Sequence, residues 1–374
     1  MVKTLATAIG RWSDLTGGHE ISALEAGMDF RQPAYRRAVF KRFYDFHIRY
    51  RSHPGCVYYL MPQLADRMEM DEEAKLWFAF LNGNTQNPLT SYLIFERFPE
   101  PSTKMQEWFD SEWARLHFDV DRRYQKQLLP KACANYAEQI NRHGSQQEYF
   151  EHLRHERIGK QAFPAVWNEV RNHMLGFGRL SAFSYTEYLW VMGQPIECSD
   201  LFLKDLSGSK SHRNGLSLVL GRDDMDWHDS NPSGFDGSYG PGVLNWLESE
   251  ADALLSECRS FSKNNPYYEH IGYHTFESAL CTYKSWHRPN RRYPNCYNDM
   301  LHDRIKQAEQ VWTDTDFSLF WQIRQDVLPK HLRLEDNPSD CGLKPSKQNH
   351  YLRTGQVIMM HNEWPEFAND WNVE

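Results

Sequence analysis

The chain has 374 residues, of which 40% are hydrophobic and 25% charged. This length and balance are typical of a globular protein with two domains or one large lobed domain. The net charge of −8 excludes a polycation that coats DNA, so contacts with DNA phosphates would need a local group of Lys and Arg. The sequence contains no run of about 18 apolar residues, so no membrane span is predicted. Seven Cys without a CxxC spacing indicate reduced thiols rather than a disulfide framework.

The spacing of apolar side chains predicts a mainly helical fold. In residues 35–50, apolar positions recur at helical spacing with basic side chains between them. Residues 71–81 begin with Asp-Glu-Glu, which favours a helix N-terminus, and residues 82–88 are predicted to form a turn. Further helices are predicted over residues 58–68, 89–97, 102–117, 121–142, 145–158, 165–175, 180–192, 241–262, 277–286, 298–310 and 317–327.

The middle of the chain has a different texture. Residues 193–242 are rich in Gly, Ser, Asp and Asn, with one β-like apolar run at 216–220. Because binding residues concentrate on ordered loops, this region is expected to carry function. We therefore expect a lead-in (1–30), a helical lobe (31–200), a loop-rich and helical catalytic lobe (201–333) and a C-terminal tail (334–374).

Two common phosphate-binding motifs are excluded. The run Gly-Phe-Gly-Arg-Leu-Ser at 176–181 lacks the third Gly of a dinucleotide fingerprint and follows a predicted helix, not a strand. Gly215 and Gly221 are one residue too far apart for a P-loop, and Arg-Asp follows where Lys-Ser/Thr is needed.

One group of residues has the spacing of metal ligands on a helix. His270, His274 and Glu277 stand at positions i, i+4 and i+7, but Gly272 weakens the helix between them and no HExxH pattern is present. We predict no metal site from this spacing.

Residues 211–228 combine acidic and basic side chains around the short apolar run. Carboxylates here suit a general base, or Mg²⁺ held together with a diphosphate, and no other cofactor is indicated. For each Asp taken singly, an ordinary role as a turn former or helix cap is at least as well supported as a catalytic role. The polar residues are His212, Arg213, Asn214, Arg222, Asp223, Asp224 and Asp226.

Residues 272–305 mix cations, amides and aromatics around a Pro-Asn-Arg-Arg-Tyr-Pro turn instead of separating them at a helical period. Guanidinium groups bind phosphate bidentately, and aromatic faces stack on bases. This mixture indicates a phosphorylated, base-containing substrate, although such residues also commonly pair with acids at the edge of a core.

The order of these motifs resembles a known family. The tracts HPGCVYYLMPQL, EEAKLWFAFLNGNTQNPLTSYLIFERFP, FGRLSAFSYTEYLW, SHRNGLSLVLGRDD and FESALCTYKSW…RRYPNCYNDMLHDRI are similar to those of the phage amino acid:DNA transferases, also called α-glutamyl/putrescinyl thymidine pyrophosphorylases. The resemblance covers roughly residues 40–310. Its most specific parts are RRYPNCYNDM and the HRNGL…GRDD pair.

The resemblance implies a step in thymidine hypermodification. The substrate would be double-stranded DNA bearing 5-(pyrophosphoryloxymethyl)uracil, and the enzyme would expel pyrophosphate and attach an amino acid or polyamine. It also implies a helical bundle similar to helix-hairpin-helix DNA glycosylases, base flipping, no membrane partner, and a location in the cytoplasm of a phage-infected bacterium. Which amino acid or amine is transferred does not follow from the sequence.

The chemistry of this reaction assigns roles to residues that match the family tracts. A leaving diphosphate needs cations, a flipped base needs aromatic faces, and an attacking amine needs a base. We expect Lys284, Arg291 and Arg292 to bind the diphosphate, and Asp299 or Asp223 to act as the general base. Trp286 and Tyr293 are expected to stack on the flipped base, and Asn214 and Asn298 to read the uracil edge. Further contacts with substrate or DNA are expected from His212, Arg213 and Arg222.

Two other functions fit the same residues. A glycosylase-like enzyme would cleave a modified base with a catalytic Asp but would need no diphosphate-binding cations. A non-catalytic DNA-binding protein of a phage would bind DNA whether or not the thymine is pyrophosphorylated.

Overall fold

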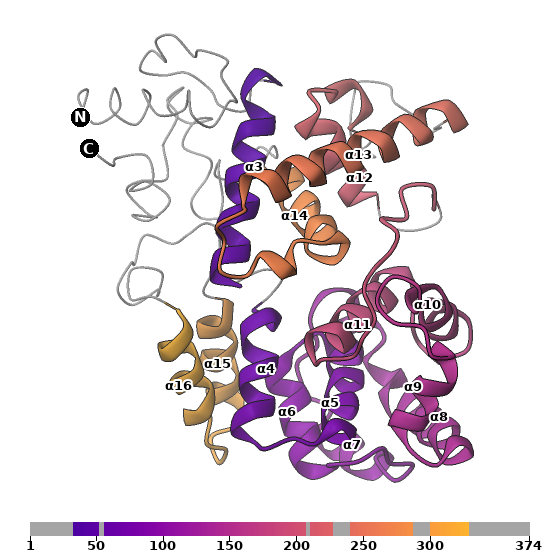
Figure 1. Cartoon of the computed structure of the whole chain (residues 1–374). Coiled ribbons are helices and arrows are strands. Elements are labelled where there is room, and N and C mark those ends of the chain that lie inside the picture. Colours follow the sequence, from indigo (N-terminus) through magenta and orange to yellow (C-terminus); the bar gives the residue numbers. More distant parts are fainter. Residues whose placement is uncertain (1–32, 52–55, 207–209, 227–239, 287–299, 329–374) are drawn as a thin grey trace, which may run out of the picture. The chain divides into compact units, whose positions relative to one another are not determined.

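The structure is a computed structural model that describes residues 33–51, 56–206, 210–226, 240–286 and 300–328. Within these ranges the chain forms 14 α-helices and four short 3-10 helices (η), and the only β pairing there is an isolated bridge between Gly159 and Ile196 (Figure 1). The prediction of a mainly helical fold is therefore confirmed. No helix in the described ranges has the length and apolar character needed to cross a membrane.

The chain contacts divide the molecule into two compact units, each assembled from separate stretches of sequence. Among the described residues, unit 1 comprises 33–51, 202–206, 210–226, 240–286 and 328, and unit 2 comprises 56–201 and 300–327. The helices of unit 1 are α3 (Pro33–Tyr50), α12 (Ser211–Val219), η3 (Asp223–Met225), α13 (Pro241–Phe261), η4 (Tyr268–His270) and α14 (Tyr273–Trp286).

Unit 2 contains the remaining helices. They are α4 (Val57–Arg67), α5 (Glu72–Thr85), α6 (Pro88–Arg97), α7 (Gln106–Glu112), η1 (Val120–Tyr124), η2 (Lys126–Leu128), α8 (Leu129–His143), α9 (Gln146–Arg154), α10 (Phe163–Asn172), α11 (Arg179–Val191), α15 (Met300–Val311) and α16 (Ser318–Val327).

The core of unit 2 is centred on α5, which packs against α6 and α11. Its aromatic rings stack closely, with 4.0 Å between the ring centroids of Phe80 and Tyr136. The predicted start and stop signals operate as expected here: the Asp71 side chain accepts a hydrogen bond from the Ala74 backbone N–H, and Gly144 ends α8 with a φ of 94°.

The core of unit 1 forms where α3, α12, α13 and α14 pack together. Phe40 of α3 makes edge-on contacts with Phe276 and Tyr283 of α14, at centroid distances of 5.7 and 5.5 Å. All three side chains are fully buried. Such aromatic pairs stabilise a core beyond the area that they bury.

The prediction of a β-like run at residues 216–220 is wrong, because residues 211–219 form the helix α12. Its side chains from His212 to Val219 are all buried. A helix that is enclosed on every side has no polar face, so the apolar and polar positions carry no helical period that the sequence could reveal.

The predicted turn at residues 82–88 is wrong for its first half, because α5 continues through Asn82–Thr85. Asn and Gly are weak helix formers, but here they lie in the core and their polar groups find partners there. Two other predicted helices are shorter: α7 occupies only part of 102–117, and residues 120–128 form 3-10 turns before α8. The remaining helices begin and end no more than four residues from their predicted bounds.

Candidate functional site

The helices α12 and α14 of unit 1 approach each other unusually closely. A Cβ atom on Gly215 of α12 would lie 2.0 Å from the backbone oxygen of Leu280 in α14, so only glycine permits this packing. The close approach brings the polar residues at the start of α12 against the polar face of α14.

A cluster of three polar side chains results, which we call the His212 cluster (His212, Glu277 and Cys281). The Nδ1 atom of His212 lies 3.4 Å from Oε1 of Glu277, and Sγ of Cys281 lies 3.5 Å from the same oxygen. His212 and Glu277 are buried, and Cys281 is partly exposed. Buried imidazole and carboxylate groups are retained where they are paired or bind a metal.

Lys284 lies next to this cluster. Of the three cations predicted to bind the diphosphate, it is the one within the described part of the chain. Its Nζ donates a hydrogen bond of 2.8 Å to Oγ of Ser211, the first residue of α12. The structure thus brings Lys284 and His212, both predicted site residues, to the same end of α12.

Arg213 and Asn214 also lie on α12 and are buried. Nη1 of Arg213 donates to the backbone oxygens of Leu203 and Asp205, at 3.2 and 2.7 Å. These bonds hold the chain that precedes α12.

The predicted residues that follow α12 form ion pairs. Asp223 accepts hydrogen bonds from both terminal nitrogens of Arg36 in α3, at 2.7 and 3.1 Å, and Arg222 forms a surface pair with Asp224. An exposed ion pair such as Arg222–Asp224 contributes little to stability. The Asp223 pair joins α3 to η3, the 3-10 helix that follows α12.

Several predicted residues lie outside the described part of the chain. Trp286 is the last residue of α14, and its side chain is not among those described. The others are Arg291, Arg292, Tyr293, Asn298 and Asp299.

The His270, His274 and Glu277 spacing does not occur on one helix, because His270 belongs to η4 and α14 begins at Tyr273. His274 is buried, and burial lowers its pKa to about 3, so its imidazole is neutral at pH 7. Glu277 instead groups with His212 and Cys281, a combination that the sequence analysis did not identify.

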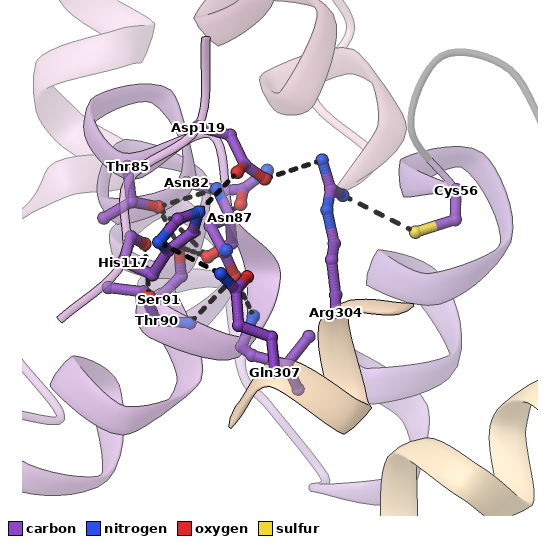
Figure 2. A network of polar contacts seen from close by, with 11 residues as sticks. Cys56, Asn82, Thr85, Asn87, Thr90, Ser91, His117, Asp119, Arg304 and Gln307 are labelled. Carbon is purple, nitrogen blue, oxygen red and sulfur yellow. Dashed lines mark hydrogen bonds and ion pairs between the residues drawn. The ribbon is translucent and has the colours of Figure 1, made fainter. Parts of the chain in front are cut away.

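A second polar cluster lies in unit 2, built on the buried run from Asn82 to Ser91 (Figure 2). Oγ1 of Thr85 lies 2.7 Å from Oγ of Ser91, which donates to the side-chain oxygen of Asn82. Thr90 Oγ1 donates to the backbone oxygen of His117, and the Asp119 N–H donates to the backbone oxygen of Thr85. The run thereby fixes the segment that carries His117 and Asp119.

Asp119 is held between two cationic or polar partners in this second cluster (Figure 2). Its carboxylate lies 2.9 Å from Nη2 of Arg304 in α15 and 3.3 Å from Nε2 of His117. Burial alone would raise the pKa of Asp119, but the His117 hydrogen bond and the Arg304 charge outweigh it and hold the pKa below its usual value. Arg304 also lies 3.9 Å from the Cys56 thiol.

A small pocket of about 90 Å³ opens beside this cluster. It has room for a few water molecules or a small polar molecule. Its lining offers guanidinium, imidazole, hydroxyl and amide groups from Asn87, Thr90, His117, Arg304 and Gln307.

Sequence reasoning missed this second cluster. The available signal was the tract Asn-Gly-Asn-Thr-Gln-Asn at residues 82–87, which places five amides or hydroxyls between two strongly apolar helices. Its polar composition was assigned to a turn, whereas the structure buries it.

Comparisons with known proteins find a family match and a similar phage protein. Residues 56–292 match the family described as "Amino acid:DNA transferase". The chain is also 26% identical over 295 residues to a protein of Salmonella phage ViI called "Serinyltransferase", covering 76% of this chain and 71% of that protein. No solved structure matches the chain. The family match covers well over half of the chain, which therefore belongs to the amino acid:DNA transferase family of enzymes, whose reaction is the transfer of an amino acid onto a DNA base.

Proposed function

We propose that the protein transfers an amino acid or polyamine onto 5-(pyrophosphoryloxymethyl)uracil in double-stranded DNA and releases pyrophosphate. The nitrogen lone pair of the donor attacks the exocyclic carbon, the bond from that carbon to oxygen breaks, and the diphosphate leaves with the electron pair. The donor then loses a proton to a base. A donor hydroxyl can react in the same way.

The observation that carries this proposal is the family match over residues 56–292, which includes Lys284, Arg291 and Arg292. We assign these three cations to the diphosphate, because charge builds up on it as the bond breaks. The anchoring of Lys284 to Ser211 supports this assignment, since a cation held in place loses less freedom on binding.

We place the base at Asp299 in preference to Asp223. Both oxygens of Asp223 accept hydrogen bonds from Arg36, so Asp223 would have to break an ion pair before it could accept a proton. Mg²⁺ held with the diphosphate remains part of the proposal.

The modified base must leave the duplex to expose its substituent. We propose that Trp286 and Tyr293 stack on the flipped base and that Asn214 and Asn298 read its edge. His212, Arg213 and Arg222 complete the proposed DNA and substrate contacts. An arrangement of helices like that of helix-hairpin-helix glycosylases would suit such flipping, and the mainly helical fold is compatible with it. We also propose action in the cytoplasm of an infected bacterium, since the relative is a phage protein.

The test is an incubation of the protein with DNA containing 5-(pyrophosphoryloxymethyl)uracil and single donors, with serine first because the relative is named a serinyltransferase. Pyrophosphate release is followed, the DNA is digested to nucleosides, and their masses are measured by mass spectrometry. We expect one pyrophosphate for each new nucleoside that carries a donor. Release of free base without an adduct would contradict the proposal and indicate a glycosylase. Binding of DNA without turnover would indicate a non-catalytic DNA-binding protein.

Variants of the cations test their assignment. Lys284→Gln and Arg292→Ala should each lower the rate of transfer by about 100-fold, the scale of losing one group that stabilises transition-state charge. Lys306→Gln is the matched control, because Lys306 is exposed on α15 and lies 3.2 Å from the carboxylate of its neighbour Glu309. Equal transfer by Arg292→Ala and the control, from folded proteins, would remove Arg292 from the site.

A further inference from the structure

The His212 cluster has the composition of a transition-metal site. It offers one imidazole nitrogen, one carboxylate oxygen and one thiol sulfur, and these three atoms lie within 4.8 Å of one another. Zn²⁺ takes this mixture of nitrogen, oxygen and sulfur ligands, whereas Mg²⁺ and Ca²⁺ prefer oxygen alone.

Two of the three spacings between these atoms also fit a tetrahedral ion. Bond lengths of roughly 2.0–2.1 Å to nitrogen and oxygen and about 2.3 Å to sulfur place tetrahedral neighbours about 3.3 Å (N to O) and about 3.5 Å (O to S) apart. The observed distances are 3.4 Å from Nδ1 of His212 to Oε1 of Glu277 and 3.5 Å from that oxygen to Sγ of Cys281.

The helices hold the three side chains in this arrangement. Glu277 and Cys281 are four residues apart and share one face of α14. His212 reaches them from α12 because Gly215, one turn further along, lets the two backbones meet at Leu280. The cluster therefore rests on two helices of the same unit and not on loops.

We infer that His212, Glu277 and Cys281 bind one Zn²⁺ ion. Three protein ligands leave a fourth position for water or a substrate atom, which is typical of catalytic zinc and not of structural zinc. The partial exposure of Cys281 places the cluster at the edge of the core, where such a ligand can enter. Binding releases the thiol proton to solvent, because the metal ligand is the thiolate.

This site lies one helical turn before Lys284 on α14, so a bound ion would add positive charge beside the proposed diphosphate site. The inference does not depend on the proposed function, since metal content is measured without DNA or donor. Failure of the transfer reaction and failure of zinc binding are therefore separate results.

The experiment is a titration of the chelator-treated full chain with Zn²⁺ in metal-buffered solution, with the metal content then measured by mass spectrometry. We expect about one tightly bound Zn²⁺ per chain. Cys281→Ala should weaken zinc binding by more than about 100-fold, beyond the loss caused by changing a residue that only orients a ligand. Cys258→Ala is the matched control, because Cys258 is a buried thiol of α13 in the same unit and should leave binding unchanged.

Substitution with Co²⁺ provides a second readout that reports the ligands directly. We expect a thiolate-to-cobalt charge-transfer band that Cys281→Ser removes and Cys258→Ala retains, with circular dichroism showing that both variants are folded. Glu277→Gln keeps the size of the side chain and should also weaken binding. Absence of zinc from folded wild-type protein, or zinc bound equally well by Cys281→Ala and Glu277→Gln, would overturn the inference and leave a buried His–Glu pair.

Discussion

Asp119 shows how opposing effects set the ionisation of a single carboxylate. Burial disfavours its charged form, whereas the His117 hydrogen bond and the Arg304 guanidinium favour it, and the net result is a pKa below the usual value. Because the folded pKa lies below the unfolded one of about 3.9, the resulting stabilisation is complete above that pH and disappears as the pH falls through the folded pKa.

We therefore predict that Asp119→Asn lowers the free energy of unfolding by about 1–3 kcal/mol at pH 7, the scale of hydrogen bonds to a charged group. The difference from wild type should shrink as the pH falls below about 4. Urea unfolding at pH 7 and pH 3.5 measures both values. Asp66→Asn, at an exposed position of α4, is the control and should change neither, whereas a pH-independent effect of Asp119→Asn would exclude this account.

Arg213 shows why residue type alone did not determine a role. Its charge and its place beside His212 predicted a contact with substrate or DNA. The structure directs its guanidinium to two backbone oxygens at residues 203 and 205, which no local pattern encodes. Lys284, in contrast, keeps a position that fits its predicted role, and the assignment of both residues to the site stays a prediction.

Among the elements, α12 depends most on a single residue. Adding a Cβ at Gly215 would place it 2.0 Å from the oxygen and 2.6 Å from the carbon of the Leu280 carbonyl, and backbone atoms cannot move aside as a side chain can. We predict that Gly215→Ala lowers the free energy of unfolding by about 2–3 kcal/mol or more, as expected for overpacking.

The same variant should disturb the His212 cluster, because α12 and α14 must separate to admit the methyl group. Gly242→Ala is the matched control, since nothing lies within 4 Å of a Cβ at that position near the start of α13. It should stabilise the protein slightly, by up to about 1 kcal/mol, through its higher helix propensity. Similar melting temperatures for the two variants would contradict the close helix contact.

The elements also show which structural features a sequence can reveal. Helix ends with clear local signals were predicted well, as with the Asp71 cap of α5 and the Gly144 stop of α8. Helical segments without an exposed face were not. The second half of α12 was assigned to a β-like run and the end of α5 to a turn, because their partners come from elements distant in sequence.

At the scale of the whole molecule, each unit is completed by segments far apart in the chain. The pair α15 and α16 packs in unit 2 although more than 100 residues separate it from α11. A local pattern can predict these two helices but cannot identify their partners. The Asp119–Arg304 pair depends on this long-range packing, which explains why the sequence did not reveal the second cluster.

The net charge of −8 leads to a prediction about DNA binding by the whole chain. Each DNA phosphate that a cation neutralises releases counterions, so the logarithm of affinity falls with the logarithm of salt concentration by about 0.9 per phosphate. A chain with excess negative charge can gain this slope only from local cations. We expect a shallow slope with unmodified DNA and a steeper one with pyrophosphorylated DNA, since the diphosphate adds charge at the proposed Lys284, Arg291 and Arg292 site.

Fluorescence anisotropy over a range of salt concentrations measures both slopes, without donor so that no turnover occurs. Arg292→Ala should reduce the slope with modified DNA by about 1 and change the slope with unmodified DNA much less. Lys306→Ala should leave both slopes unchanged, because that side chain lies on the exposed face of α15. Equal slopes for the two DNAs in the wild-type protein would mean that the arginines contact the backbone and not the leaving group, and the diphosphate would then have to be stabilised by other cations.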